Sequence, residues 1–384
     1  MGFTEDEVVV LGYLLYPYEA ELSVEVNDPD LIILRGPFSN SPKPVIRVPT
    51  RSDWQGDYQE PRSWGNGIVD LTFDLINACS RKLESVMNPK VAFAYKLLTG
   101  LPFRYNIVPS WLRSSFLRLH HVDSNLSRHL ANEMARKILV EAFGLLGFRL
   151  KRKNPPSFLV THDVETEKGL GRALSLKGVE DDLDVQSFWF LLSDEYRITR
   201  DVARELADGS IIGSHDRKHD GRLICVRGHD ELVSRFTASR LRLEGIFERG
   251  VECFRSPLLQ FSERIVAALS EAGYQFDFSL PCWEPVHPLT MKGFGVELLQ
   301  AFKIGGVTET PLTLFQDHQL LNVIGMSAHE ATRLWIEEAK LIRSFDGDIV
   351  LLIHPDYSFS RELQLYRELL ASLLEVHIGA SRNE

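Results

Sequence analysis

The segment GSHDRKHDG, residues 213–221, contains two histidines whose spacing suits a metal site. His215 and His219 lie four positions apart, directly after the apolar pair Ile211-Ile212. Side chains four residues apart share one face of a helical turn, so both rings can converge on one point. Neutral imidazole is the commonest protein ligand for a transition metal. The pair is therefore a candidate ligand set for a divalent ion, with zinc the first choice. Without further partners, the alternative is a solvated loop.

The elements that would position these histidines follow from the pattern after residue 157. Short apolar runs rich in β-forming residues are expected to be strands, and helical patterns separate several of them. The strands are expected at 157–163, 188–192, 211–215, 252–257, 275–280, 307–313 and 348–354, and the helices include 229–248, 262–274, 327–345 and 360–378. This alternation implies βα units and a parallel sheet. Seven strands over about 220 residues approach the size of a barrel.

Several ionisable residues share a register in these expected strands. Asp163, His215 and His354 each end a strand, Arg255 lies near the end of a fourth, and Asp277 falls within a fifth. Catalytic groups of parallel βα barrels gather at the carboxyl ends of the strands. The pattern therefore places these five side chains around one mouth of a barrel.

The composition limits the class of protein. With 384 residues, 44% of them apolar and 25% charged, it is an ordinary globular chain, and its net charge of −10 argues against a nucleic-acid partner. Four scattered cysteines without a CxxC pair indicate a reducing compartment. The N-terminus is acidic, unlike a secretory signal, and its apolar stretch 8–15 is shorter than the about 20 residues that span a bilayer. We therefore expect a cytoplasmic protein without a membrane span.

The segment KRKNPPS, residues 151–157, divides the chain. Before it, 31–35 and 44–48 have the pattern of strands, and 67–86 and 124–146 have helical spacing. We predict an α+β N-terminal domain, residues 1–153, to which the sequence assigns no role, followed by an α/β barrel domain, residues 154–384.

Five short stretches carry a resemblance to a known family. They are THDVE (161–165), HDRKH (215–219), RSP (255–257), DFSLPCW (277–283) and LLIHP (351–355). In this order they resemble the motifs of the polysaccharide deacetylases, carbohydrate esterase family four, over about residues 157–375. The resemblance implies a distorted seven-stranded (β/α) barrel and the metal-dependent removal of acetyl groups.

The resemblance also implies roles for single residues. The two histidines of HDRKH, with one acid, would hold the metal. Asp163 would be the general base, oriented by Arg255. His354 would be the general acid, and Asp277 would tune its pKa. This agrees with the general chemistry, because a three-ligand zinc site leaves a position for water and lowers the pKa of that water to about 7.

The opening motif departs from the family pattern. Val164 stands where the family has a metal-binding Asp, and Glu165 follows it. Side chains two apart along a strand point the same way, so Asp163 and Glu165 would both face the interior. We interpret Glu165 as the replacement ligand. The alternative is that Asp163 binds the metal itself and that no separate base exists. His162 receives no role, and Asp216 replaces the usual Ser/Thr of the second motif.

Three functions are consistent with this pattern. The first is a metal-dependent deacetylase that removes N- or O-acetyl groups from a glycan or glycan precursor. The second is a hydrolase of another carbon–nitrogen bond, of the cyclic amide or imide type, on the same barrel. The third is a degenerate barrel that binds glycan without catalysis, for which Val164 would be the sign. Asp163, Arg255 and His354 together favour an enzyme acting on a carbohydrate or small amide.

Overall fold

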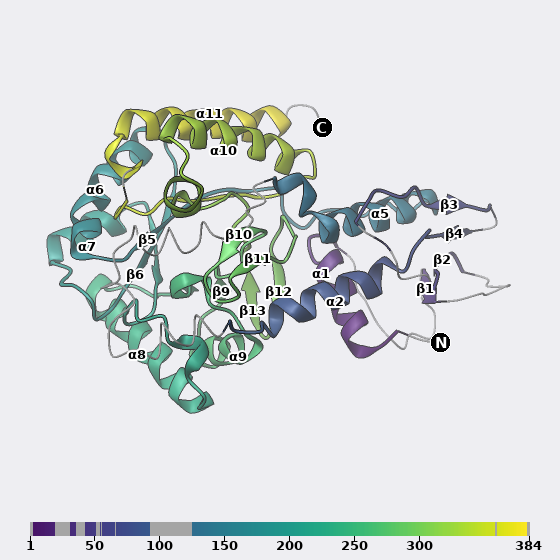
Figure 1. Ribbon diagram of the computed structural model, residues 1–384, viewed down its shortest axis with the longest axis horizontal. Helices are drawn as coiled ribbons and strands as arrows, with labels where there is room; N and C mark the ends of the chain where they lie inside the picture. Colours follow the sequence, from purple (N-terminus) through teal and green to yellow (C-terminus); the bar gives the residue numbers. More distant parts are fainter. Residues whose placement is uncertain are drawn as a thin grey trace.

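The structure is a computed structural model, and it describes residues 3–19, 31–35, 43–50, 54, 56–65, 67–92, 125–357 and 359–381. Figure 1 shows a curled sheet surrounded by helices at one end of the molecule and a smaller group of helices and strands at the other. The candidate site residues lie in or just after strands of the curled sheet, so this part of the molecule positions the site.

The large sheet has eight strands. Their order is β12 (Phe302–Ile304), β13 (Val307–Glu309), β9 (Phe276–Asp277), β8 (Cys253–Phe254), β7 (Ile211–Ser214), β6 (Ser187–Leu191), β5 (Phe158–Val164) and β14 (Ile349–Leu352). All neighbours pair in parallel except β12 and β13. The seven parallel strands are those expected from the sequence. Strands covered on both faces need apolar residues on both, which explains why β14 is buried throughout.

An irregular segment brings the two ends of the seven parallel strands together. After β13, Leu312 forms a parallel bridge with Pro281, which continues the line of β9. Leu314 N–H then donates to Val350 of β14 (3.2 Å), and Val350 N–H donates to the Thr313 hydroxyl (2.8 Å). The curled sheet is thus a distorted barrel, as predicted, and its closure relies partly on a side chain rather than on a regular ladder.

Helices cover the outer face of this sheet (Figure 1). They are α6 (Glu167–Asp182), α7 (Arg200–Ala207), α8 (His229–Phe247), α9 (Glu263–Glu271), α10 (Ala328–Arg343) and α11 (Leu363–Ser381). Hydroxyl side chains cap α6, α7, α9 and α10 at their N-termini, which satisfies backbone N–H groups that have no partner within the helix. A hairpin, β10 (Glu284–His287) and β11 (Lys292–Phe294), and a π-helical turn, His318–Ile324, lie between β9 and α10.

The described part of the N-terminal region contains a small sheet and three α-helices. The sheet order is β1 (Ile32–Arg35), β2 (Val45–Val48), β4 (Ile68–Asp70) and β3 (Arg62–Ser63), and the helices are α1 (Glu5–Leu15), α2 (Leu75–Met87) and α5 (Ala131–Leu145). The prediction of one helix over 67–86 is wrong in its first part. Residues 68–70 pair with β2, and α2 begins only after Asp74, whose carboxylate accepts from the Asn77 N–H (3.1 Å).

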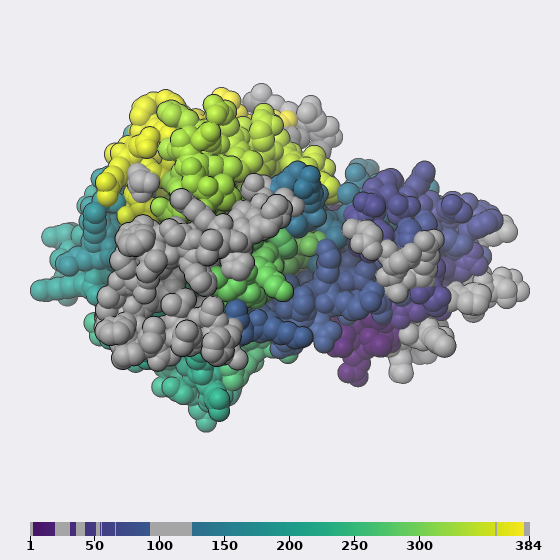
Figure 2. Space-filling model, in the orientation of Figure 1, coloured from purple at the N-terminus to yellow at the C-terminus, as the bar shows by residue number. Residues whose placement is uncertain are grey.

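One apolar cluster extends from the N-terminal region into the barrel. Leu14 of α1, Leu139 of α5 and Phe302 of β12 are all buried members of it. Figure 2 shows the N-terminal atoms, purple to blue, directly beside the green surface of the barrel. The boundary near residue 153 stays a prediction. Among the described residues, no helix is both long and apolar enough to cross a membrane.

Candidate metal centre and active site

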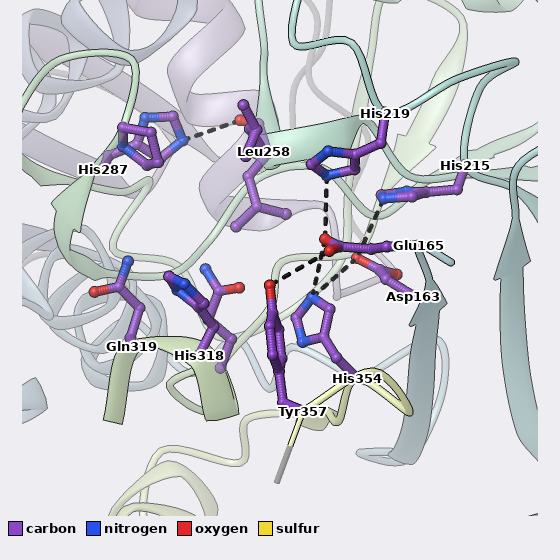
Figure 3. A pocket seen from close by; sticks show the side chains of 13 residues that line it. Asp163, Glu165, His215, His219, Leu258, His287, His318, Gln319, His354 and Tyr357 are labelled. Carbon is purple, nitrogen blue, oxygen red and sulfur yellow. Dashed lines mark hydrogen bonds and ion pairs between the residues drawn. The ribbon is translucent and has the colours of Figure 1, made fainter. Parts of the chain in front are cut away.

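A cavity opens at the carboxyl ends of the barrel strands (Figure 3). It brings together side chains from β5, from the segments that follow β7 and β14, and from the β10 and π-helical segments. The lining residues are Asp163, Glu165, His215, His219, Leu258, Leu259, His287, Pro288, Gln316, His318, Gln319, His354 and Tyr357. Five of the seven site residues expected from the sequence are among them.

Three side chains form a possible ligand set for a metal ion. One ligand atom each of Glu165, His215 and His219 lies within 4.8 Å of the other two. His219 Nε2 is 3.1 Å from Glu165 Oε1. Three protein ligands with one open position are typical of a catalytic zinc site. These residues fit a divalent ion, as the sequence predicted.

His215 has its ring nitrogens in separate environments. Nδ1–H donates to the Arg255 carbonyl oxygen at 2.8 Å, which leaves the lone pair on Nε2. Nε2 is buried and has no hydrogen-bond partner. Burial lowers the pKa of His215 to about 4, so the ring is neutral at pH 7. A neutral imidazole oriented by a backbone carbonyl is the form that binds metals.

His219 differs from His215 because it faces a carboxylate. Burial alone would lower the pKa of His219, but the charge of Glu165 and its hydrogen bond raise it above the ordinary value. Burial would raise the pKa of Glu165, and the charge of His219 more than offsets this and holds it well below its usual range. Without metal each side chain favours the charged form of the other across a 3.1 Å contact, whereas a metal ion bound to His219 would need the neutral imidazole.

The structure shows whether the Glu165 side chain faces the same cavity as Asp163. β5 ends at Val164, which is buried in the apolar cluster, so Glu165 already lies past the strand. Its side chain still enters the cavity, because the Asp356 carboxylate accepts hydrogen bonds from the Glu165 N–H (3.0 Å) and from the Thr166 hydroxyl. Asp163 and Glu165 thus reach the same cavity, although Glu165 lies beyond the strand whose alternation is the basis of that prediction (Figure 3).

Asp163 lies between the ligand set and the interior of the barrel. Arg255 Nη1 donates to its Oδ1 at 3.1 Å, and its Oδ2 lies 3.9 Å from the Nε2 atoms of both His215 and His354. Burial alone would raise the pKa of Asp163, but the charge of Arg255, followed by those of the two histidines, lowers it. Arg255 is fixed in turn by the Phe278 carbonyl oxygen (2.9 Å). The expected contact between Arg255 and Asp163 is present.

His354 is held by a residue that the sequence did not identify. Asp317 Oδ1 lies 2.6 Å from His354 Nδ1, and Asp317 Oδ2 accepts the His354 backbone N–H at 3.0 Å. Burial alone would lower the pKa of His354, but the charge and hydrogen bond of Asp317 raise it to about 10. Nε2 faces the cavity, 3.9 Å from Glu165 Oε1. The imidazole is therefore protonated at neutral pH and faces the candidate metal ligands.

Asp277 does not contact His354 in this way, which corrects the expected source of the tuning charge. It is fully buried in the barrel, where the Ser279 hydroxyl donates to its Oδ1 (2.5 Å). Burial raises its pKa to about 6 and raises that of its neighbour Glu309 still further. The two carboxyl groups share a buried site below the cavity. Among the described residues, the carboxylate that forms hydrogen bonds with His354 is that of Asp317, which follows an irregular segment without a strand pattern.

Two other residues of the motifs have structural partners. His162 points to the opposite face of β5, where Nδ1 lies 2.8 Å from the Ile353 carbonyl oxygen and Nε2 lies 2.8 Å from Glu180. Asp216 has a left-handed backbone (φ 69°), and its carboxylate accepts hydrogen bonds from Arg235 Nε (2.9 Å) and Nη2 (2.5 Å). Asp216 therefore braces the loop between His215 and His219.

The fold and site define a class: a parallel α/β barrel with a candidate metal centre between a buried carboxylate and a buried imidazole. No protein-family model and no curated protein matches the sequence. Solved structures do resemble it. A protein assigned as a polysaccharide deacetylase from Mycobacterium smegmatis covers 58% of this chain and 85% of its own length, at 18% identity and a TM-score of 0.46.

Two further structures have similar shapes. The chitin deacetylase of the fungal pathogen Colletotrichum lindemuthianum covers 58% of this chain and 84% of its own, at 15% identity and a TM-score of 0.41. A family 4 pseudoenzyme from Bacillus anthracis covers 59% and 63%, at 14% identity and a TM-score of 0.38. The chain thus resembles polysaccharide deacetylases of carbohydrate esterase family four and is distant from them in sequence.

Proposed function

We propose that this chain is a metal-dependent deacetylase that removes N- or O-acetyl groups from a glycan or glycan precursor. One observation carries the proposal: Glu165, His215 and His219 offer ligand atoms within 4.8 Å of one another, beside Asp163 and His354 in one cavity. When bound there, a divalent ion such as Zn²⁺ would polarise the acyl carbonyl and lower the pKa of a water molecule.

Asp163 is the proposed general base. Its carboxylate is ionised at neutral pH, because Arg255 lowers its pKa despite complete burial. It is also fixed in direction, since one oxygen accepts from Arg255 and the other faces the two histidines. Asp163 therefore takes the proton from the attacking water as the new carbon–oxygen bond forms.

His354 is the proposed general acid. Breaking the amide or ester bond requires a proton on the leaving nitrogen or oxygen. Asp317 keeps His354 protonated and orients its Nε2 toward the cavity. The products are acetic acid, which ionises to acetate and releases a proton to solvent, and the free amine or alcohol; the proton gained by Asp163 balances the one given by His354.

The buried charges favour an enzyme over a binding module. Asp163, Arg255, Asp317 and His354 are almost completely buried. Removing charges from water is costly, and a buried ion pair contributes little net stability. Ionisable groups with shifted pKa values, such as Asp163 and His354 here, cluster at catalytic sites. A barrel that only bound glycan would gain nothing from maintaining them.

Metal content and acetate release from an acetyl ester and from N-acetylated oligosaccharides test the proposal. We expect about one equivalent of divalent metal in the purified protein and acetate release that chelation abolishes. If the protein instead hydrolyses cyclic imides by opening their rings, it is a hydrolase of a different carbon–nitrogen bond. Metal binding without hydrolysis of any of these substrates would contradict the proposed enzymatic activity and support a barrel that binds glycan without catalysis.

Variants at the two acids test the division of roles. Asp163→Asn should retain the metal, because its ligands are unchanged, while turnover falls by roughly 10²–10⁴, the usual contribution of a general base. Glu165→Ala should lose metal affinity, because two neutral imidazoles lack the negative charge that stabilises a dication. Metal stoichiometry by elemental analysis distinguishes them. Loss of metal in Asp163→Asn but not in Glu165→Ala would make Asp163 the ligand.

A further inference from the structure

The two oxygens of Glu165 have different neighbours. Oε1 lies 3.1 Å from His219 Nε2 and 3.9 Å from His354 Nε2, so it faces the candidate ligand set. Oε2 accepts a hydrogen bond from the Tyr357 hydroxyl at 3.3 Å. Figure 3 shows the Tyr357 hydroxyl reaching Glu165 from the side of the cavity opposite His219. One oxygen is therefore directed to the metal site while the other is held by a protein donor.

Tyr357 is itself held in place from several sides. Its ring lies between those of His354 and His318, with centroid distances of 4.9 and 5.2 Å. The Ser360 hydroxyl lies 2.8 Å from the Tyr357 carbonyl oxygen, and Arg172 of α6 donates to the Pro355 carbonyl oxygen (3.1 Å). The phenol is thus fixed before any ligand arrives, and its hydrogen bond orients Glu165 at small entropic cost.

The same short loop also fixes the backbone of Glu165. In HPDY, residues 354–357, His354 faces the cavity, the Asp356 carboxylate accepts the Glu165 N–H (3.0 Å), and Tyr357 holds the Glu165 carboxylate. A glutamate has one more rotatable bond than an aspartate, and Glu165 lies beyond the end of β5. For both reasons its side chain needs more restraint than that of an aspartate within the strand. Asp356 and Tyr357 restrain it at its two ends.

We propose that Tyr357 is a positioning residue that makes Glu165 a metal ligand through Oε1 alone, by keeping Oε2 engaged. This inference rests on the proposed metal site. Hydrogen bonds to ligating carboxylates fix their orientation, and their loss typically costs 10- to 100-fold in metal affinity. Keeping Glu165 to one oxygen also leaves room among the ligands for water and substrate.

The test uses the full-length protein loaded with Co²⁺ or Zn²⁺ alone. Tyr357→Phe should weaken metal binding by about 10- to 100-fold in chelator competition. It should also change the visible Co²⁺ absorption, because a released carboxylate can bind through both oxygens. Tyr58→Phe is the matched control: the Tyr58 hydroxyl also donates to a glutamate, Glu141, at 2.6 Å, but in the N-terminal region. It should leave affinity and spectrum unchanged.

A double-mutant cycle with Glu165→Asp isolates the contact. The shorter aspartate cannot both reach the histidines and receive the Tyr357 hydroxyl. Tyr357→Phe should therefore cost little in the Glu165→Asp background, which gives a coupling comparable to the single effect of Tyr357→Phe. Unchanged affinity and spectrum in Tyr357→Phe, with metal bound by the wild type, would overturn this inference and leave the proposed function intact. A wild type that binds no metal would overturn the proposed function itself.

Discussion

His354 and Asp317 show how one buried carboxylate can set the state of an acid. Asp317 uses Oδ2 for the His354 backbone N–H, and Oδ1 for His354 Nδ1 and for the His318 N–H. The aspartate has no exposed surface, so its charge acts on the imidazole through a medium that screens it poorly. Ring orientation and protonation thus come from the same side chain.

Asp317→Asn should move the alkaline limit of activity to lower pH. The acid must be protonated, so activity falls as pH rises through the pKa of His354, about 10 in the wild type. Without the negative charge, burial lowers that pKa, and activity falls at a lower pH. The measurement is kcat/KM against pH. Asp277→Asn should not move this limit, and a shift in Asp277→Asn alone would return the tuning role to Asp277.

The sequence predicts single residues only where a local pattern marks them. His215 and His219 are marked by their spacing, and Asp163 and His354 by their places at strand ends. Asp317 has no such mark. It follows an irregular segment, and only the closure of the sheet brings it to His354, 37 positions later. Tyr357 and Asp356 are missed for a similar reason, because their contacts with residue 165 span more than 190 positions.

The junction between β5 and α6 is the element on which the candidate ligand set depends. Asp356 lies beside the N-terminus of α6, where its carboxylate accepts from the Glu165 N–H and the Thr166 hydroxyl, while burial and the charge of Glu165 raise its pKa to about 6. Gly169, in the first turn of α6, leaves room for it. A Cβ there would lie 2.3–2.6 Å from the Asp356 carboxylate. The glycine is needed for close approach, since its φ is not in the left-handed region.

Gly169→Ala should displace Asp356 and thereby weaken both folding and metal binding. Gly178→Ala on the same helix has no atom within 4 Å of the new Cβ. It should raise the free energy of unfolding by about 0.5–1 kcal/mol, because alanine is the better helix former. Denaturant titrations and metal competition measure the two effects. If both substitutions stabilise the protein equally, the close approach of the Asp356 carboxylate to residue 169 does not require a glycine.

The element pattern was predictable in order but not in length. Some of the observed strands are shorter than expected. β8 and β9 have two residues each where the sequence pattern predicts 252–257 and 275–280, and β13 has three where it predicts 307–313. Apolar β-forming runs signal where a strand passes through the core. Where pairing stops depends on the neighbouring strand, which local sequence does not encode. The hairpin β10–β11 has no apolar alternation strong enough to be recognised.

At the scale of the whole molecule, Glu297 joins the N-terminal region to the barrel. α5 has no side-chain cap of its own. Glu297 lies in the segment after β11. Its carboxylate accepts a hydrogen bond from the Ala131 N–H (2.8 Å) and forms an ion pair with Lys82 of α2 (2.8 Å). Asn132 also donates to the Val296 carbonyl oxygen (2.7 Å). A helix of the first region is thus capped by a residue of the second.

Glu297→Ala should lower the free energy of unfolding by about 1–3 kcal/mol, because it removes the cap of α5 and leaves the buried Ala131 N–H without a partner. Lys82 is about half exposed, so Lys82→Ala should cost less than about 1 kcal/mol. Because one apolar cluster spans both regions, thermal unfolding should show a single transition. Two separate transitions would contradict this coupling.

The place of β5 between β6 and β14 also has a consequence for synthesis on the ribosome. β14 is the last strand of the sheet, and the contact between His162 and Ile353 joins residues 191 positions apart. Until that late segment emerges, a strand rich in apolar residues presents one unpaired edge, the kind of surface that recruits other chains. The nascent protein therefore passes through a long interval of aggregation risk, which ends only when the segment carrying His354 arrives and completes the cavity.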